Sequence, residues 1–131
     1  MWKNIEIPES TDVHVIACWE WDEDKIFQQW NVYVANLKRE PIEMVLVMSR
    51  GYSDDKKSST LRHGLGDIPA REKAKIEMID EQVFELHNEY LVTYLYDGKM
   101  IEKTFTFKPN SFIEDEQCKL ADSIFKGIIA E

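Results

Sequence analysis

One short segment, residues 59–79 with the sequence STLRHGLGDIPAREKAKIEMI, collects side chains that could do chemistry. Arg62, His63 and Asp67 could form an acid–base or anion-binding group, because a histidine beside a cation and near a carboxylate can titrate near neutral pH. The same segment can also be architecture: two strands joined by a turn over 66–69, where Gly66 tolerates a positive φ and Pro69 fixes its own. We favour the architectural interpretation, because two strands and a turn account for every residue of the segment.

The charge of the chain limits its partners. The formal net charge is −9, which argues against nucleic acid, since phosphate binding needs clustered lysine and arginine. Residues 50–75 are the exception, with seven Lys and Arg against four Asp and Glu. This basic segment would suit an acidic partner, such as the acidic surface of a second copy. It also supplies Arg62, His63 and Arg71 as candidate ligands for a small anion or a carbohydrate.

Other chemistry finds no support in the residue spacing. The three histidines, His14, His63 and His87, are scattered and show no metal-binding spacing. Neither a GxSxG nucleophile motif nor a glycine-rich phosphate loop occurs. The carboxylates of 20–24 and 114–116 fit solvated turns. We therefore expect no enzyme activity, no catalytic residue, no metal and no cofactor.

The cysteines and the hydropathy indicate a compartment. Cys18 and Cys118 are the two cysteines, and the first residues lack the apolar run of a signal peptide. No stretch approaches the roughly 18 apolar residues of a membrane span. We expect a cytoplasmic protein with free thiols and no membrane partner.

The elements that must position these residues are mainly strands, because apolar residues recur with a period of two. In 73–78, this alternation predicts Ala74, Ile76 and Met78 inside and Lys73, Lys75 and Glu77 in water. Residues 42–49 are apolar on both faces past Glu43, as is typical of a central strand. Further strands are expected at 13–21, 30–37, 60–65 and in the hairpin 90–107, with a short edge strand at 4–7.

Two local patterns refine this picture. Asp97-Gly98 supplies the positive φ angles of a two-residue type I′ hairpin turn. Leu120, Ile124 and Ile128 lie four residues apart and predict a short helix over 119–129.

The aromatic residues on these strands could fill the core or form a stacking platform. Trp19 and Trp21 share a strand face with Val13 and Val15, which favours the core. Tyr94 and Tyr96 lead into the hairpin turn, and we expect them to be the more exposed pair.

These elements predict an all-β chain of one domain, residues 1–131. The expected architecture is an antiparallel β-sandwich of seven or eight strands, with core strands at about 12–108 and a C-terminal appendage at 109–131. A small closed barrel is the alternative. The pattern over 12–108 resembles the immunoglobulin/fibronectin-III-like sandwiches, particularly 30-WNVYVANLKREPIEMVLV-47 followed by 65-LGDIPAREKAKIEM-78.

The chain is also similar to a group of short bacterial proteins with a layout of SRGY, STLRH, GDI and HNEY. That group has no established activity, and some of its members carry a phenylalanine–tRNA ligase label. A chain of 131 mainly β residues leaves no room for a core that handles ATP and tRNA. We therefore expect a non-catalytic protein-interaction or structural module that binds another protein or itself, as a homodimer. The alternative is a module for a small anion or a carbohydrate, built on the basic segment.

Overall fold

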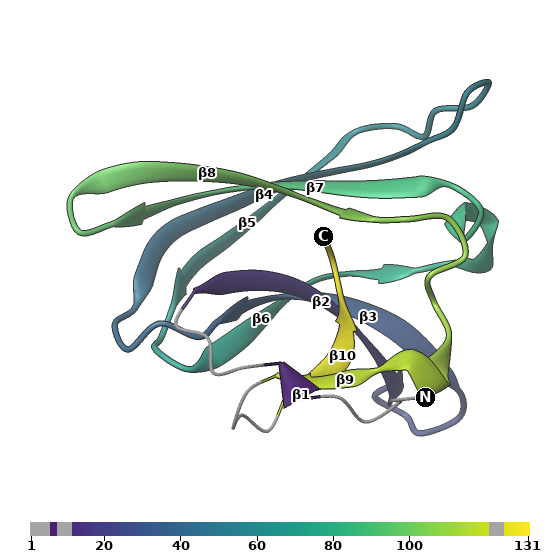
Figure 1. Cartoon of the computed structure of the whole chain (residues 1–131), viewed down its shortest axis with the longest axis horizontal. Coiled ribbons are helices and arrows are strands. Elements are labelled where there is room, and N and C mark those ends of the chain that lie inside the picture. Colours follow the sequence, from purple (N-terminus) through teal and green to yellow (C-terminus); the bar gives the residue numbers. More distant parts are fainter. Residues whose placement is uncertain (1–5, 8–11, 121–124) are drawn as a thin grey trace.

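The computed structural model describes residues 6–7, 12–120 and 125–131, and within them the chain is a sandwich of two β-sheets (Figure 1). The larger sheet contains, in spatial order, β1 (Glu6–Ile7), β9 (Cys118–Leu120), β10 (Lys126–Ile129), β2 (Val13–Trp21), β3 (Gln28–Asn36) and β6 (Glu72–Ile79). The smaller sheet contains β5 (Leu61–Ile68), β4 (Ile42–Tyr52), β7 (His87–Tyr96) and β8 (Lys99–Phe107). Two short 3-10 turns, η1 (Glu81–Val83) and η2 (Glu114–Glu116), are the helical elements of the described residues. The prediction of an all-β sandwich is confirmed.

The core lies between the sheets, where alternate residues of each strand point inward. Val15, Val32 and Val34 of the larger sheet are fully buried, as are Val47 and Val92 of the smaller one. Neighbouring strands are antiparallel except for β1 and β9, which pair in parallel. The period-two prediction is therefore confirmed for the strands that carry the core.

Of the two predicted turns, the hairpin turn lies where the sequence predicts it and the turn over 66–69 is displaced. Asp97 and Gly98 have φ angles of 52° and 72°, as a type I′ turn requires, and join β7 to β8. Segment 59–79 is strand, turn and strand, but Gly66 lies inside β5 and the turn falls at 69–71, where Arg71 has a φ of 62°. Since β5 and β6 belong to different sheets, this turn carries the chain across the sandwich.

The predicted C-terminal helix is wrong wherever the chain is described, because 118–120 and 126–129 are strands; 121–124 lie outside the described residues. Ile128 and Ile129 pair with Ala17 and Ile16 of β2, and this tertiary pairing overrides the four-residue spacing. The added strands bring the described total to ten instead of seven or eight. The last residue then reaches the smaller sheet: the Glu131 backbone N–H donates to the Thr106 carbonyl at 3.0 Å.

The aromatic expectations were partly wrong. Tyr94 is fully buried and belongs to the core, while Tyr96 packs partly against it. The reason is alternation, because Tyr94 follows Val92 on the inward face of β7. Trp19 packs on the core as expected, but Trp21 is exposed at the end of β2.

Replacing Gly127 changes the free energy of unfolding in opposite directions for a strand and for a helix. A Cβ at this position would lie 2.7 Å from the Ala17 carbonyl oxygen, so Gly127→Ala must displace β10 from β2 and should lower the free energy of unfolding by about 1–3 kcal/mol. In a helix the same change would raise stability by about 1 kcal/mol. Gly64→Ala is the control, because its Cβ would meet only the Leu46 side chain at 3.7 Å. Urea unfolding of the two variants measures the difference; a more stable Gly127→Ala protein would contradict the strand.

Candidate functional site

A β-bulge in β6 sets the geometry of the most polar part of the interior. Val32 of β3 pairs with Glu77 whereas the next residue, Tyr33, pairs with Lys75, so Ile76 is the extra residue of β6. An extra residue reverses the alternation beyond it. Glu77 therefore points between the sheets and Met78 points out with 47% of its surface exposed. The prediction that Met78 is inside and Glu77 is in water is wrong for this reason.

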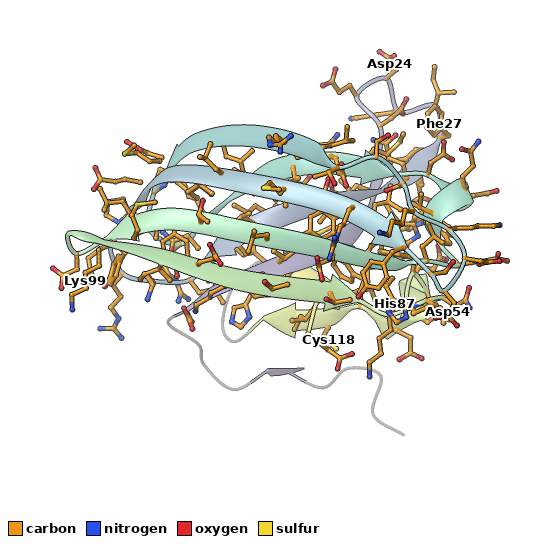
Figure 2. All side chains as sticks on the ribbon, turned by 90° about the horizontal axis from the view of Figure 1, so that it is seen from above. Asp24, Phe27, Asp54, His87, Lys99 and Cys118 are labelled. Atoms are coloured by element: carbon orange, nitrogen blue, oxygen red, sulfur yellow. The ribbon has the colours of Figure 1, made fainter. Side chains whose placement is uncertain are left out.

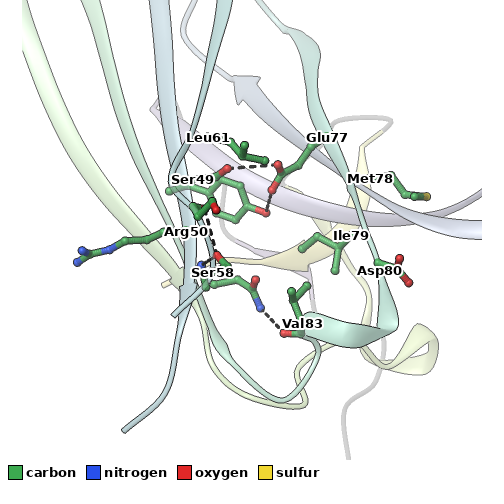
Figure 3. A pocket seen from close by; sticks show the side chains of 13 residues that line it. Ser49, Arg50, Ser58, Leu61, Glu77, Met78, Ile79, Asp80 and Val83 are labelled. Carbon is green, nitrogen blue, oxygen red and sulfur yellow. Dashed lines mark hydrogen bonds between the residues drawn. The ribbon is translucent and has the colours of Figure 1, made fainter. Parts of the chain in front are cut away.

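The Glu77 carboxylate is held by three side chains of the smaller sheet, and Figure 3 draws the hydrogen bonds that it accepts from two of them. The Tyr90 hydroxyl donates to Oε2 at 2.8 Å, and the Ser49 hydroxyl donates to Oε1 at 3.2 Å. His63 Nε2 lies 3.3 Å from Oε1 and 3.2 Å from the Ser49 Oγ. We call these four residues the Glu77 cluster. Burial and the neighbouring Glu77 charge raise the pKa of the Tyr90 phenol, so this donor stays protonated.

A cavity of about 240 Å³ opens beside the Glu77 cluster. Several of its other polar groups are bonded within the protein, and Figure 3 draws such hydrogen bonds at Ser58 and at Val83. The Gly51 backbone N–H donates to the Ser58 hydroxyl at 2.7 Å, and the Asn88 amide donates to the Val83 carbonyl at 2.9 Å. The lining residues also include Ser59 and Asp80.

A serine, a histidine and a carboxylate invite comparison with a catalytic triad, but the geometry differs. In a triad one imidazole nitrogen faces the hydroxyl and the other faces the carboxylate. Here Nε2 of His63 faces both Ser49 and Glu77. Ser49 is also only 4% exposed. The cluster is built to join β4, β5 and β7 to β6.

The predicted ligands Arg62, His63 and Arg71 do not converge. Arg62 and His63 are neighbours on β5 and point to opposite faces of the smaller sheet, with Arg62 exposed. Arg71 lies in the turn after β5, where its guanidinium donates to the Leu37 carbonyl at 3.0 Å. Other cations of the basic segment are also paired, such as Arg50 with Glu89 at 2.8 Å. Of the three residues, only His63 belongs to the Glu77 cluster.

The opposite edge of the sandwich carries a second bridging carboxylate. Asp12, just before β2, accepts from the Lys103 ammonium of β8 at 2.6 Å and lies 3.7 Å from Lys38. Burial alone would raise the pKa of Asp12, but Lys103 and the Val13 backbone N–H outweigh it and hold the pKa below its ordinary value.

The outward face of the smaller sheet carries several exposed apolar side chains. We call it the outer apolar face; it consists of Met44, Leu46, Met48, Leu91, Leu95 and Met100. Met44, Leu46 and Met100 are 62%, 57% and 63% exposed. Across the strands, Met48 pairs with Leu91 and Leu95 pairs with Met100, while Thr93 lies between these two pairs, opposite Leu46.

Met44 also has an unusual backbone. Its φ is 53°, in the left-handed region that costs a side-chain-bearing residue about 1 kcal/mol or more. The conformation belongs to an irregularity in the pairing of β4 with β5, and the Met44 N–H donates to the Asp67 carboxylate at 3.1 Å. Strain of this kind concentrates at functional positions. Here it presents an apolar side chain to solvent.

The two thiols are free, as predicted. Cys18 and Cys118 lie on either side of Gly127, in strands separated by β10. Two strand spacings amount to about 10 Å, beyond the roughly 7 Å between Cα atoms that a disulfide spans. Burial is the main cause that raises the pKa of Cys18 to about 11, so its thiol stays protonated.

Among the described residues, no group of three or more His, Cys, Asp or Glu side chains is placed to hold a metal ion. Nor does that part of the chain contain a helix long and apolar enough to cross a membrane. No protein-family model matches the chain, and no curated protein matches it either.

Sequence reasoning missed Ser49, Glu77 and Tyr90, since a bulge that turns a carboxylate inward leaves no mark on the period-two pattern. It also missed the outer apolar face, although a signal was present. Residues 42–49 are apolar on both faces, which was interpreted as burial on both sides. The strand is central in its sheet, yet nothing in the described chain covers its outer face.

Two tyrosines that donate to glutamates test the structural role of the cluster. Tyr90→Phe leaves the partly buried Glu77 short of a donor and should lower the free energy of unfolding by about 1–3 kcal/mol. Tyr96→Phe is the matched control, because its hydroxyl donates to the exposed Glu40, and its effect should stay within about 0.5 kcal/mol. Equal effects in urea unfolding would show that the Glu77 cluster does not join the sheets.

The tyrosines also predict an alkaline limit to stability. The folded pKa is raised for Tyr90, chiefly by burial, and raised to about 12 for Tyr94, again chiefly by burial, from an ordinary value of 10.0. A raised folded pKa stabilises the protein fully below pH 10, and this contribution is lost as the pH rises toward the folded pKa. The free energy of unfolding should therefore fall above about pH 10, and less steeply in Tyr90→Phe. Urea unfolding at increasing pH measures both; a flat profile to pH 12 would contradict the burial of these phenols.

Proposed function

We propose that the protein is a non-catalytic interaction module of the cytoplasm, with an immunoglobulin- or fibronectin-III-like sandwich as its scaffold. Its binding surface is the outer apolar face, and its partner is a second copy of the chain. The observation that supports this proposal is the exposure of Met44, Leu46, Met48 and Met100 on one face of the smaller sheet. Monomeric proteins rarely leave large contiguous apolar patches in water.

The composition of the face suits a protein partner. Half of its six residues are methionines, whose unbranched side chains adapt to an opposing surface. Each apolar Å² removed from water contributes about 25 cal/mol. Met44 contributes to the exposed apolar area, because its left-handed backbone directs the side chain outward and not into the core.

A second copy is favoured by the charges at the two sides of the face. Arg62 lies outward on β5, next to Met48, whereas Glu102 lies outward on β8, the opposite edge strand. When two such sheets meet face to face about a two-fold axis parallel to the strands, β5 of each copy lies over β8 of the other. The Arg62 side of one copy then faces the Glu102 side of its partner. Such self-complementarity is what a two-fold interface requires.

The size of the face sets the strength. Four strands about 4.8 Å apart, with some eight residues of about 3.3 Å each, cover roughly 500 Å² in plan. A standard interface buries about 800 Å² per partner. We therefore expect a weak dimer whose population depends on protein concentration.

Leu46 is the residue to change, since it lies on β4, an inner strand of the smaller sheet, and is well exposed. Leu46→Asp should abolish dimer formation in sedimentation velocity runs at increasing concentration, because association would bury an unpaired carboxylate. Ile113→Asp is the control: Ile113 is comparably exposed but lies outside this face, and the variant should dimerise like the original protein.

A charge exchange tests the identity of the partner. Arg62→Glu alone and Glu102→Arg alone should each weaken the dimer by placing like charges opposite each other, and the double variant should restore it. An original protein that stays monomeric at every concentration would contradict the proposal. So would single and double variants that dimerise equally well.

A further inference from the structure

A second cavity, of about 470 Å³, lies at the end of the sandwich opposite Lys99 (Figure 2). Figure 2 shows Phe27 in the loop that projects at this end, with Lys99 at the other. We call the cavity the aromatic pocket, because five aromatic residues line it: Trp19, Phe27, Trp30, Phe84 and Phe112. Its volume falls within the range of roughly 300–1,000 Å³ that small-molecule sites occupy.

The aromatic rings form a continuous wall. Trp19 packs on Trp30 with 5.4 Å between ring centroids, Trp30 on Phe112 at 5.8 Å, and Phe112 on Phe84 at 5.2 Å. The rings are tilted to one another by 52°, 60° and 32°. They therefore enclose a space from several directions and do not form one flat platform. A flat platform is what stacking on a sugar or a base would require.

The exposed Phe27 is held in place by its own loop. The Asp22 carboxylate accepts from the backbone N–H of Ile26 at 2.8 Å and of Phe27 at 3.3 Å. The Asp22 N–H in turn donates to the Phe27 carbonyl at 2.9 Å. The backbone of the loop between β2 and β3 is thus closed on itself, which lowers the cost of ordering the loop when Phe27 contacts a ligand.

The charges around the pocket have one sign. Asp80, Glu81 and Glu114 line it, and no lysine, arginine or histidine is among the lining residues. Within the described part of the chain, none of these three carboxylates forms an ion pair. Carboxylates repel an anion and attract a cation, and the faces of tryptophan and phenylalanine also attract cations.

We propose that the aromatic pocket binds an organic cation, an ammonium or guanidinium group carried on an apolar body. The apolar body packs against Phe27, Phe84 and Trp19, while the positive charge lies near Asp80, Glu81 and Glu114. This site is separate from the outer apolar face and does not depend on dimer formation.

Choline and its uncharged isostere 3,3-dimethylbutan-1-ol provide a matched pair of probes, because they share shape and differ in charge. In NMR titrations, choline should shift the indole signals of Trp19 and Trp30 saturably, and the isostere should bind at least roughly tenfold more weakly. The amides of Asp97 and Gly98, at the other end of the molecule, should not move. Equal binding of the isostere would overturn the proposal. A neutral monosaccharide that shifts the same signals more strongly than choline would also overturn it.

Variants of the lining residues test which side chains attract the positive charge of the ligand. The triple change Asp80→Asn, Glu81→Gln and Glu114→Gln should weaken choline binding by roughly tenfold, and Phe27→Ala should weaken it severalfold. All four positions are exposed, so the variants should fold. Glu72→Gln is the control, because Glu72 is exposed at the other end of β6, and this variant should bind as the original protein does. Unchanged binding by the triple variant would overturn the proposal.

Titration with N-acetyl-lysine methylamide then separates the two sources of such a cation: tighter binding than choline indicates a side chain of a polypeptide, and weaker binding indicates a free small molecule.

Discussion

The Glu77 carboxylate lies between the two sheets because the extra residue Ile76 reverses the alternation of β6. A carboxylate in this position destabilises the sandwich unless donors meet it. Ser49 and Tyr90 supply them from β4 and β7, and His63 approaches from β5. Three strands of the smaller sheet are thereby tied to one residue of the larger sheet. If β6 paired one residue out of register, Met78 would point inward and Glu77 would point to water, and the Ser49 and Tyr90 hydroxyls would lose their acceptor. The bulge therefore fixes how the two sheets meet.

The opposite edge repeats the same device with other residues. Asp12 precedes β2 and accepts from Lys103 of β8, and the C-terminal Glu131 pairs with Thr106 of the same strand. Both edges of the sandwich are therefore bridged by polar contacts, while apolar residues fill the space between them. With its inner face committed in this way, the smaller sheet cannot turn Leu46 or Met48 inward. Their exposure follows from the fold, and contact with a partner is what would remove these side chains from water.

Local rules predicted what local interactions determine. The Asp97-Gly98 turn follows from positive φ angles, and the valine-rich inner faces follow from alternation. The errors with the largest consequences concern a distant strand. The helix over 119–129 was wrong because β2 pairs with β10, and Tyr94 is buried because β7 is opposed by the larger sheet. The position of Glu77 depends on which residue of β3 it pairs with, and a period of two cannot express that.

The claim that the outer apolar face binds a second copy can be tested on the methionine side chains themselves. Three of the five methionines, Met44, Met48 and Met100, lie on that face, whereas Met78 is exposed on the other sheet. Spectra of ¹³C-methyl-methionine protein at increasing concentration should show the signals of those three methionines moving together, toward one dimer state. The Met78 signal should stay in place. Signals of Met44, Met48 and Met100 that do not change with concentration, or that change no more than that of Met78, would contradict the account.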